Sequence, residues 1–151
     1  MIYRPVGQVF DYVSAPENDF QWQYGTLATA NLSEATGAIG ALFRSIGHLM
    51  GRRVLSTFEV TEYEPHTKYA FKSVSGPLNS VTCYTFEIAN GCTKVNVATQ
   101  ANIINSFQIN EAVLEKRMKK QLKENLALLK DLLEGRRGAP VAEIKSLIVE
   151  M

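Results

Sequence analysis

The stretch formed by residues 81–103, VTCYTFEIANGCTKVNVATQANI, predicts a β-hairpin. Two runs of alternating residues flank Asn90-Gly91, a pair that favours a two-residue turn because both turn positions need a positive φ. The turn sets the register of the two strands, with Ala89 opposite Cys92. Because side chains alternate between the two faces of a strand, this register predicts which of them share a face.

The predicted register separates a buried face from an exposed one. Glu87 falls opposite Lys94, a favourable cross-strand pair on the exposed face. Cys83 faces Ala98, far from Cys92, so we expect no disulfide between the two cysteines. The side chains expected on the buried face are those of Thr82, Tyr84, Phe86, Val95, Val97 and Thr99.

Earlier in the chain, strand-like runs are separated by turn-forming residues. The hydrophobic pattern takes on strand character from about residue 24. The gaps between the runs are short, which predicts sequential hairpins and therefore an antiparallel meander with one buried face. The predicted strands cover residues 41–49, 54–63, 69–75, 81–89 and 93–103.

Helical spacing appears on both sides of the strand region. Residues 5–22 predict short helical pieces, interrupted at Pro16. Residues 105–134 predict one long helix, with Asn105 or Ser106 as its N-cap and Gly135 as its terminator. The apolar stripe of this helix contains Leu114, Met118, Leu122, Leu126, Leu129 and Leu133.

Together these elements predict an α+β fold over residues 1–134, followed by a linker and short tail at 135–151. A curved antiparallel sheet is expected to grip the long C-terminal helix against its apolar face, because each element has only one such face. Two short helices near the N-terminus complete the domain. Since one helix cannot fill a strongly curved sheet, we expect a cavity between them.

The composition is that of one globular domain. The chain has 151 residues, of which 46% are hydrophobic and 21% charged. A net charge of +1 argues against the strong positive field of nucleic-acid-binding proteins. There is no apolar run near the roughly 20 residues of a membrane span, and no signal-peptide layout at the N-terminus. We therefore expect a cytoplasmic protein with no stable membrane insertion.

Four stretches of the sequence resemble one protein family. They are RPVGQVFDYVSAPENDFQWQ at residues 4–23, GRRVLSTFEVTEYEPHTKYAFKSVSGP at 51–77, YTFEIANGCTKVNV at 84–97 and LKENLALLKDLLE at 122–134. Their order and spacing resemble the START-related polyketide cyclase/dehydrase superfamily, also called the SRPBCC or helix-grip proteins. The resemblance covers about residues 3–134, although each piece alone is mainly a packing and turn pattern.

This resemblance implies a hydrophobic pocket between the sheet and the long helix. In such a family the pocket holds a lipid, a polyketide or another apolar small molecule, and some members are cyclases or dehydrases. Register and helix stripe together select the candidate ligand-binding residues: Phe43, Phe58, Tyr69, Phe71, Ser73, Tyr84, Phe86, Thr99, Leu114, Met118 and Gln121. Further polar residues that could face the pocket are Ser45, Ser56, Thr82, Arg117 and Asn125. For each of them, ordinary packing is the competing interpretation, and Trp22 is expected to be a packing anchor.

The chain departs from the family pattern at its start. Members usually begin with a full strand that pairs with the last one, whereas only residues 1–3 correspond to it here. The last strand, residues 93–103, would then be an exposed edge. We expect residues 144–149 to pair with this edge, within one chain or in a swapped homodimer. The alternative left open is a misplaced gene start with an undocked tail.

The titratable residues indicate no ordinary catalytic arrangement. The two histidines, His48 and His66, are expected outside the pocket, and Glu59 and Glu62 on opposite faces of one strand. Metal-ligand spacing, a Cys–His or Ser–His pair and a phosphate-binding glycine loop are missing from the sequence, so we expect no metal and no cofactor. Three hypotheses remain: an apolar-ligand binder, a cyclase or dehydrase on the same scaffold with catalytic residues unknown, and a protein-interaction module.

Overall fold

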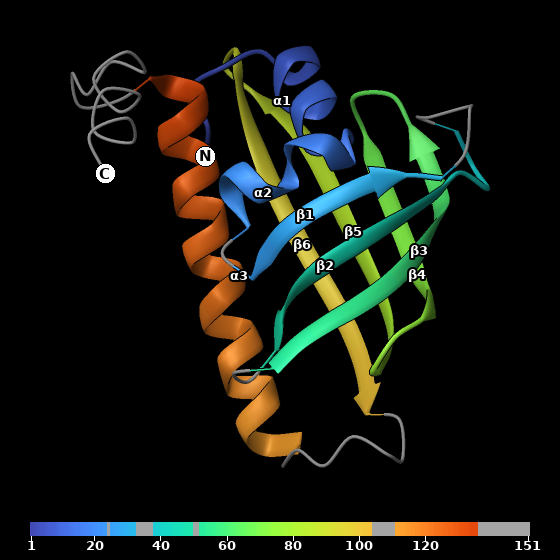
Figure 1. Cartoon of the computed structure of the whole chain (residues 1–151). Coiled ribbons are helices and arrows are strands. Elements are labelled where there is room, and N and C mark those ends of the chain that lie inside the picture. The colour runs from blue at the N-terminus through green and yellow to red at the C-terminus, as the bar shows by residue number, and fades with distance from the viewer. Residues whose placement is uncertain (24, 33–37, 50–51, 104–110, 136–151) are drawn as a thin grey trace, which may run out of the picture.

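The protein is described by a computed structural model over residues 1–23, 25–32, 38–49, 52–103 and 111–135. Six strands form one antiparallel sheet in which sequential strands are neighbours, so the predicted meander is confirmed (Figure 1). The strands are β1 (Thr26–Asn31), β2 (Leu42–Leu49), β3 (Arg52–Glu64), β4 (Lys68–Ser75), β5 (Leu78–Ala89) and β6 (Cys92–Ile103).

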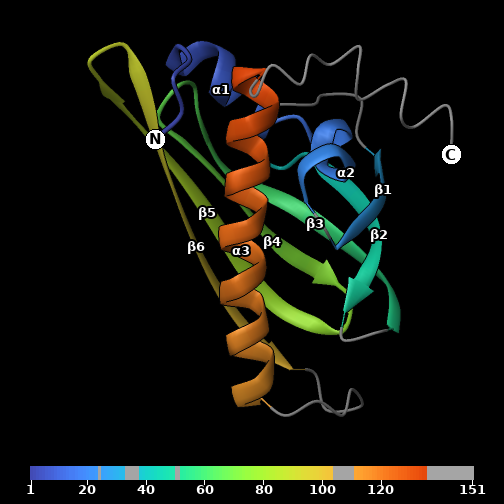
Figure 2. The ribbon, with the colours of Figure 1, turned by 90° about the vertical axis from the view of Figure 1, so that its left-hand side faces the viewer.

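Within the described residues, three α-helices accompany the sheet. Helices α1 (Val6–Val13) and α2 (Asp19–Trp22), joined through a 3-10 turn at Pro16–Asn18, cover one end of it. The long helix α3 (Glu111–Glu134) lies across the mouth of the curved sheet (Figure 2). The predicted α+β helix-grip architecture is therefore confirmed. The N-cap prediction at residues 105 and 106 lies outside the described residues.

The hairpin β5–β6 has the predicted register. Ala89 pairs with Cys92 and Glu87 with Lys94, while both cysteines are free. Asn90 and Gly91 adopt φ values of 53° and 77°, the left-handed conformation that the two-residue turn requires. The two-residue period and one tight turn were thus sufficient to predict the pairing of residues 81–89 with β6.

A bulge in β3 corrects the predicted placement of two carboxylates. Thr61 is an extra residue in the pairing with β4, so the alternation of side chains shifts by one there. Glu62 pairs with Lys68 at 3.2 Å, and Glu59 with Lys72 at 4.0 Å. Because Lys68 and Lys72 are four residues apart on one strand, they share a face. Glu59 and Glu62 therefore lie on the same face, not on opposite faces.

The hydrophobic core is concentrated where α1 and α2 meet the sheet. Phe10 of α1 is fully buried, and its ring packs edge-on against Tyr63 and Phe86 at centroid distances of 5.3 and 5.1 Å. Trp22 is 1% exposed and packs against Tyr84, in agreement with its predicted role as an anchor. This end of the sheet is filled by side chains from the short helices.

The N-terminal residues meet the edge of β6. Ile2 forms a two-hydrogen-bond bridge with Thr93, at 2.7 and 2.8 Å. The end of α3 is tied to the same segment, since Glu134 accepts a hydrogen bond from the Tyr3 backbone N–H at 2.8 Å. At this end Gly135 has a φ of +59°, consistent with the predicted terminator. The predicted pairing of residues 144–149 with β6 lies outside the described residues.

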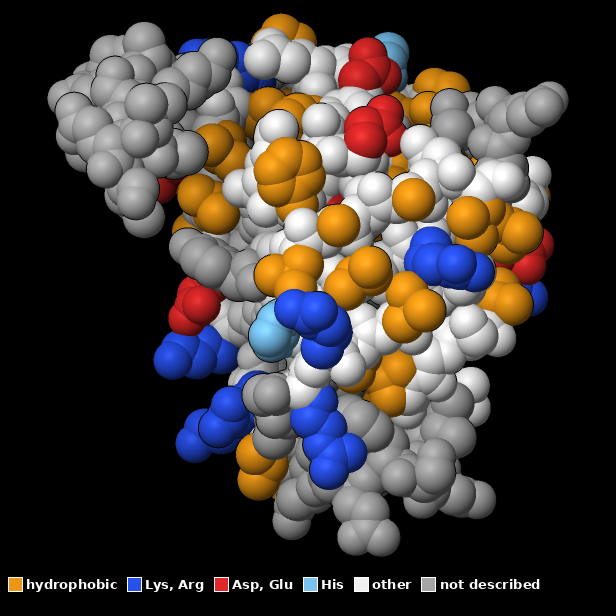
Figure 3. Space-filling model, in the orientation of Figure 1, with side chains coloured by type: hydrophobic (Ala, Val, Ile, Leu, Met, Phe, Trp, Pro, Cys, Tyr) orange, Lys and Arg blue, Asp and Glu red, His pale blue; other side chains and the backbone are white. Residues whose placement is uncertain are grey.

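The outer face of the sheet carries exposed hydrophobic side chains. Ile46 and Leu55 lie opposite each other on β2 and β3, and both remain exposed. Figure 3 shows such side chains interspersed with basic ones on the face that carries β1 and β2. Scattered apolar residues on a protein surface are ordinary. The space between α3 and the sheet offers more specific chemistry.

Candidate functional site

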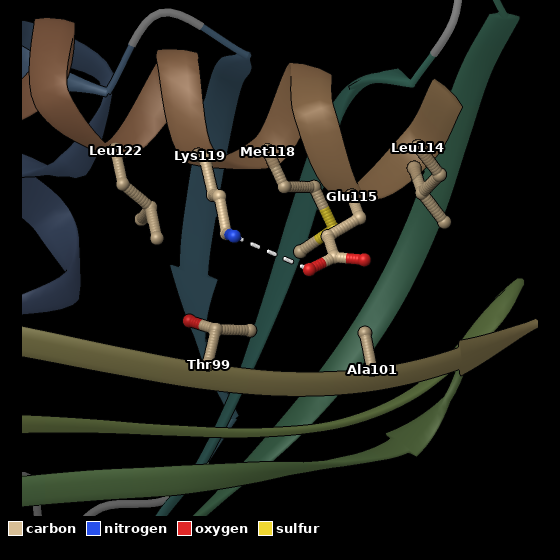
Figure 4. A pocket seen from close by; sticks show the side chains of 7 residues that line it. All are labelled: Thr99, Ala101, Leu114, Glu115, Met118, Lys119 and Leu122. Atoms are coloured by element: carbon tan, nitrogen blue, oxygen red, sulfur yellow. Dashed lines mark ion pairs between the residues drawn. The ribbon is translucent and has the colours of Figure 1, made fainter. Parts of the chain in front are cut away.

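A first cavity, the β6 cavity, lies between the N-terminal half of α3 and β6 and has a volume of about 260 Å³. Figure 4 shows leucine and methionine side chains descending from α3, with Thr99 and Ala101 facing them from β6. At its rim Glu115 and Lys119 form an exposed ion pair at 3.3 Å. The wall consists of Thr99, Ala101, Leu114, Glu115, Met118, Lys119 and Leu122.

A second cavity, the central cavity, lies between α3 and the middle of the sheet and has a volume of about 200 Å³. It shares Thr99, Met118 and Leu122 with the β6 cavity, so the two adjoin. Strands β3 to β6, helix α3 and the residue that follows α2 all contribute to it. Its wall consists of Gln23, Phe58, Phe71, Leu78, Ser80, Thr82, Tyr84, Thr99, Met118, Gln121, Leu122 and Asn125.

A third cavity, the β2 cavity, opens between β2, β3 and the start of β5, with a volume of about 150 Å³. It shares Phe58, Leu78 and Ser80 with the central cavity. The three cavities therefore follow one another across the sheet as a single apolar groove. The wall of the third consists of Gly25, Ser45, Gly47, His48, Val54, Ser56, Phe58, Ser73, Pro77, Leu78 and Ser80.

The floor of the groove is held by contacts between neighbouring strands. The hydroxyl groups of Thr82 and Thr99, which are directly opposite each other, lie 3.1 Å apart. The Ser73 hydroxyl accepts a hydrogen bond from the Ser80 backbone N–H at 2.8 Å. Each hydroxyl keeps capacity for another partner, since a hydroxyl oxygen can accept as well as donate.

Aromatic rings form the inner wall. Phe58 and Phe71 pack edge-on at 5.3 Å, and Phe71 lies 6.5 Å from the ring of Tyr84. Phe43 stacks behind Phe58 at 5.3 Å, and Tyr69 lies behind Tyr84 at 6.4 Å. These contacts hold the rings in place, so the inner wall of the groove is preformed.

Eight of the predicted ligand-binding residues border the groove, and three do not. Phe43, Tyr69 and Phe86 are 2–4% exposed and sit in the core behind the groove. Phe86 faces inward as predicted, but Phe10 of α1 occupies the space in front of it. The eight that border the groove are Phe58, Phe71, Ser73, Tyr84, Thr99, Leu114, Met118 and Gln121.

Sequence reasoning missed several wall residues. Leu78 and Ser80 continue the alternation of Thr82 and Tyr84, so a strand beginning at 78 instead of 81 would have included them. Gln23 carried no such signal, because its position depends on how the segment after α2 crosses β2. Of the further polar candidates, Ser45, Ser56, Thr82 and Asn125 border the groove, whereas Arg117 is exposed.

Burial alters the acidity of the groups next to the groove. It raises the pKa of Tyr84 and of Tyr69, and a nearby Asp19 carboxyl adds to the effect. Burial also raises the pKa of Asp19 well above its usual range, with a further contribution from Glu17. The phenols therefore stay protonated and can donate hydrogen bonds. Behind them, the indole N–H of Trp22 is buried with no hydrogen-bond acceptor among the described residues.

Family membership follows from a match over most of the chain. The model of the polyketide cyclase/dehydrase and lipid transport family matches residues 1–134. The chain belongs to this family. No curated protein sequence matches it. The described residues contain no helix able to span a membrane and no group of three potential metal ligands.

Solved structures of family-like proteins share the fold at low sequence identity. A START superfamily protein from Mycobacterium smegmatis has a TM-score of 0.75 at 10% identity, covering 88% of this chain and 92% of that one. The protein TTHA0849 from Thermus thermophilus has a TM-score of 0.65 at 19% identity, covering 85% and 86%. The di-domain ARO/CYC BexL from the BE-7585A biosynthetic pathway has a TM-score of 0.68 at 15% identity, covering 88% of this chain and 44% of that one.

Proposed function

We propose that the protein binds a hydrophobic small molecule, such as a lipid or polyketide, in the groove between α3 and the sheet. The observation that carries this proposal is the continuity of the three cavities, because the central cavity shares wall residues with each of the other two. Phe58, Phe71, Leu78, Met118 and Leu122 supply the apolar surface. A preformed concave site with an apolar wall and a few polar groups is the usual form of a small-molecule site.

A cyclase or dehydrase activity in the same groove is the second candidate. Its support is Tyr84, which borders the central cavity and whose phenol stays protonated, so that it can act as a hydrogen-bond donor. Proton abstraction would also need a base. The described wall of the central cavity contains no carboxylate and no histidine. Binding without chemistry is therefore the better supported of the two.

Native mass spectrometry of protein purified without detergent tests the binding proposal. We expect a discrete added mass of a few hundred daltons that is lost on denaturation, because an apolar groove retains a cellular ligand. The same spectrum reports monomer or dimer, which tests the predicted homodimer through β6 or the tail. A bare mass, together with no uptake of any added apolar compound, would contradict the proposal and favour the protein-interaction hypothesis.

A further inference from the structure

The polar groups of the central cavity are all uncharged. Amide side chains reach it from two directions, Gln23 from the residue after α2 and Gln121 and Asn125 from α3. Ser80 and Tyr84, which carry hydroxyl groups, line it from β5 beside the paired threonines. None of the described residues that line this cavity carries a charge.

Within the described part of the groove wall, His48 borders the β2 cavity, and the only Lys, Arg, Asp or Glu side chains are at the rim of the β6 cavity. Glu115 and Lys119 neutralise each other there, with side chains 70% and 74% exposed. Such an exposed pair attracts an anion weakly, because solvent screens it. Residues 104–110, which connect β6 to α3, contribute no charged side chain to the sequence either. Among the described residues that line the central cavity, an anionic ligand group would therefore find no counter-ion.

The ionisable group buried beside the cavity is itself an acid. Asp19 acts electrostatically on Tyr84 and has no salt bridge to a lysine or arginine among the described residues. If it is ionised it repels an anion, and if it is neutral it supplies no attraction. Neither state attracts a carboxylate or phosphate into the central cavity by charge.

A purely hydrocarbon ligand would also fit the wall poorly. It would remove water from the amide of Gln121 and from the Tyr84 hydroxyl without replacing their hydrogen bonds, whereas the Gln23 amide already has Asp19 as a partner. Each lost hydrogen bond to a neutral group weakens binding by about three- to tenfold. Amides and hydroxyls can donate to a carbonyl oxygen and can both donate to and accept from a hydroxyl.

We propose that the central cavity selects an uncharged ligand bearing a carbonyl or hydroxyl oxygen, rather than a fatty acid or other anionic lipid. This inference rests on the proposed binding function and adds the chemistry of the ligand. Gln121 and Tyr84 hold the oxygen of the ligand, while its apolar part lies against Phe58 and Phe71. That part extends toward the β6 cavity, whose side chains are drawn in Figure 4.

The test compares three naphthalenes of nearly equal size: 2-acetylnaphthalene, 2-ethylnaphthalene and 2-naphthoate. Equilibrium dialysis against the full chain at neutral pH gives their affinities. The ketone is expected to bind about five- to tenfold more tightly than the hydrocarbon, because it restores at least one hydrogen bond. Naphthoate is expected to bind at least about tenfold more weakly than the ketone, because its charge must be desolvated.

Two variants test which side chains cause the preference for the ketone over the hydrocarbon. Gln121→Leu and Tyr84→Phe keep the approximate size of the side chain and remove one polar group each. Both are expected to reduce the ratio of the affinity for the ketone to the affinity for the hydrocarbon. Because the two affinities are measured on the same variant, a general loss of binding does not change this ratio. Lys120→Met is the matched control, because Lys120 lies next to Gln121 on the solvent side of α3, with a side chain 79% exposed.

Each outcome decides between the two proposals. Equal affinities for ketone and hydrocarbon would overturn the selective cavity and leave the apolar groove supported. The tightest binding by naphthoate would overturn the selectivity as well. If none of the three compounds bound, the proposed binding function itself would be contradicted, and the inference with it.

Discussion

The side-chain amide of Gln121 lies directly over Gly25: a methyl group at position 25 would come within 2.5 Å of the Nε2 atom of Gln121. The contact joins α3 to the segment between α2 and β1, across the place where the central and β2 cavities meet. Gly25 has no positive φ, so the lack of a side chain matters here for space alone. A small residue at this position lets Gln121 reach over the sheet.

Gly25→Ala is expected to displace Gln121 and to lower the free energy of unfolding by about 1 kcal/mol, since the amide is the flexible end of its side chain. Urea denaturation measures this value. In a Gln121→Ala background the same substitution should cost less than about half as much, because the group in the way is gone. Equal costs in both backgrounds would show that the amide does not lie on Gly25.

Gly47→Ala is expected to be more damaging, by about 2–3 kcal/mol. A methyl group at position 47 would overlap the backbone oxygen of Gly25. This oxygen accepts a hydrogen bond from the His48 N–H at 2.7 Å, so backbone would have to move and the hydrogen bond would weaken. Urea denaturation of both alanine variants ranks them. A cost at position 47 no larger than that at position 25 would contradict this close crossing of the two segments.

Ser80→Phe is expected to block the groove, because Ser80 borders both the central and the β2 cavity. The ring should lower the affinity for 2-acetylnaphthalene at least about tenfold, at a cost of about 1–3 kcal/mol in stability. Asn79→Phe is the control, since the neighbouring residue is exposed and points away from the groove. Loss of binding in both variants would place the ligand outside these cavities.

Asp19→Asn tests the buried carboxyl. Since the pKa of Asp19 is higher in the folded chain than in the unfolded chain, the folded state binds the proton more tightly. Stability should therefore fall as pH rises from the unfolded pKa of this group, near about 4, through its folded value. Each tenfold difference in proton affinity corresponds to about 1.4 kcal/mol.

In Asp19→Asn this fall should disappear, and the variant should equal or exceed the wild type in stability at neutral pH. Urea denaturation at intervals between about pH 4 and 8 gives the profile. Asp11→Asn, on the exposed side of α1, is the control and should keep the wild-type pH profile. If the wild-type profile stayed parallel to that of Asp19→Asn over the whole interval, the pKa of Asp19 would not be raised by folding.

The β5–β6 turn offers a test that involves backbone conformation alone. Gly91 has a φ of +77° and nothing within 4 Å of the place where a methyl group would be. Gly91→Ala should therefore cost about 1 kcal/mol through the left-handed conformation, and Gly91→Asn clearly less, because asparagine tolerates it. Thermal or urea unfolding compares the two. Equal stability of both variants would mean that the turn relaxes to another type.

Local periodicity alone was enough to predict strands β2 to β6 and most of their inward face, whereas β1 was not among the predicted strands. The Asn90-Gly91 turn defined the register that places Tyr84, Thr82 and Thr99 on the concave side. It did so because side chains alternate strictly in a regular strand, and a two-residue turn allows only one register between the two strands. The same alternation failed at Thr61, where a bulge moves Glu59 and Glu62 to one face.

The tertiary structure alone decided which inward side chains meet a cavity and which meet a helix. Phe86 and Tyr84 share a face and a strand, yet Phe10 covers Phe86 while Tyr84 borders the central cavity. The sequence also offered no indication that Gly25 approaches Gln121 closely, because the two residues lie far apart in the chain. Strand periodicity is a local property of the backbone. The cavity under α3, in contrast, depends on how elements that are distant in the sequence pack around it.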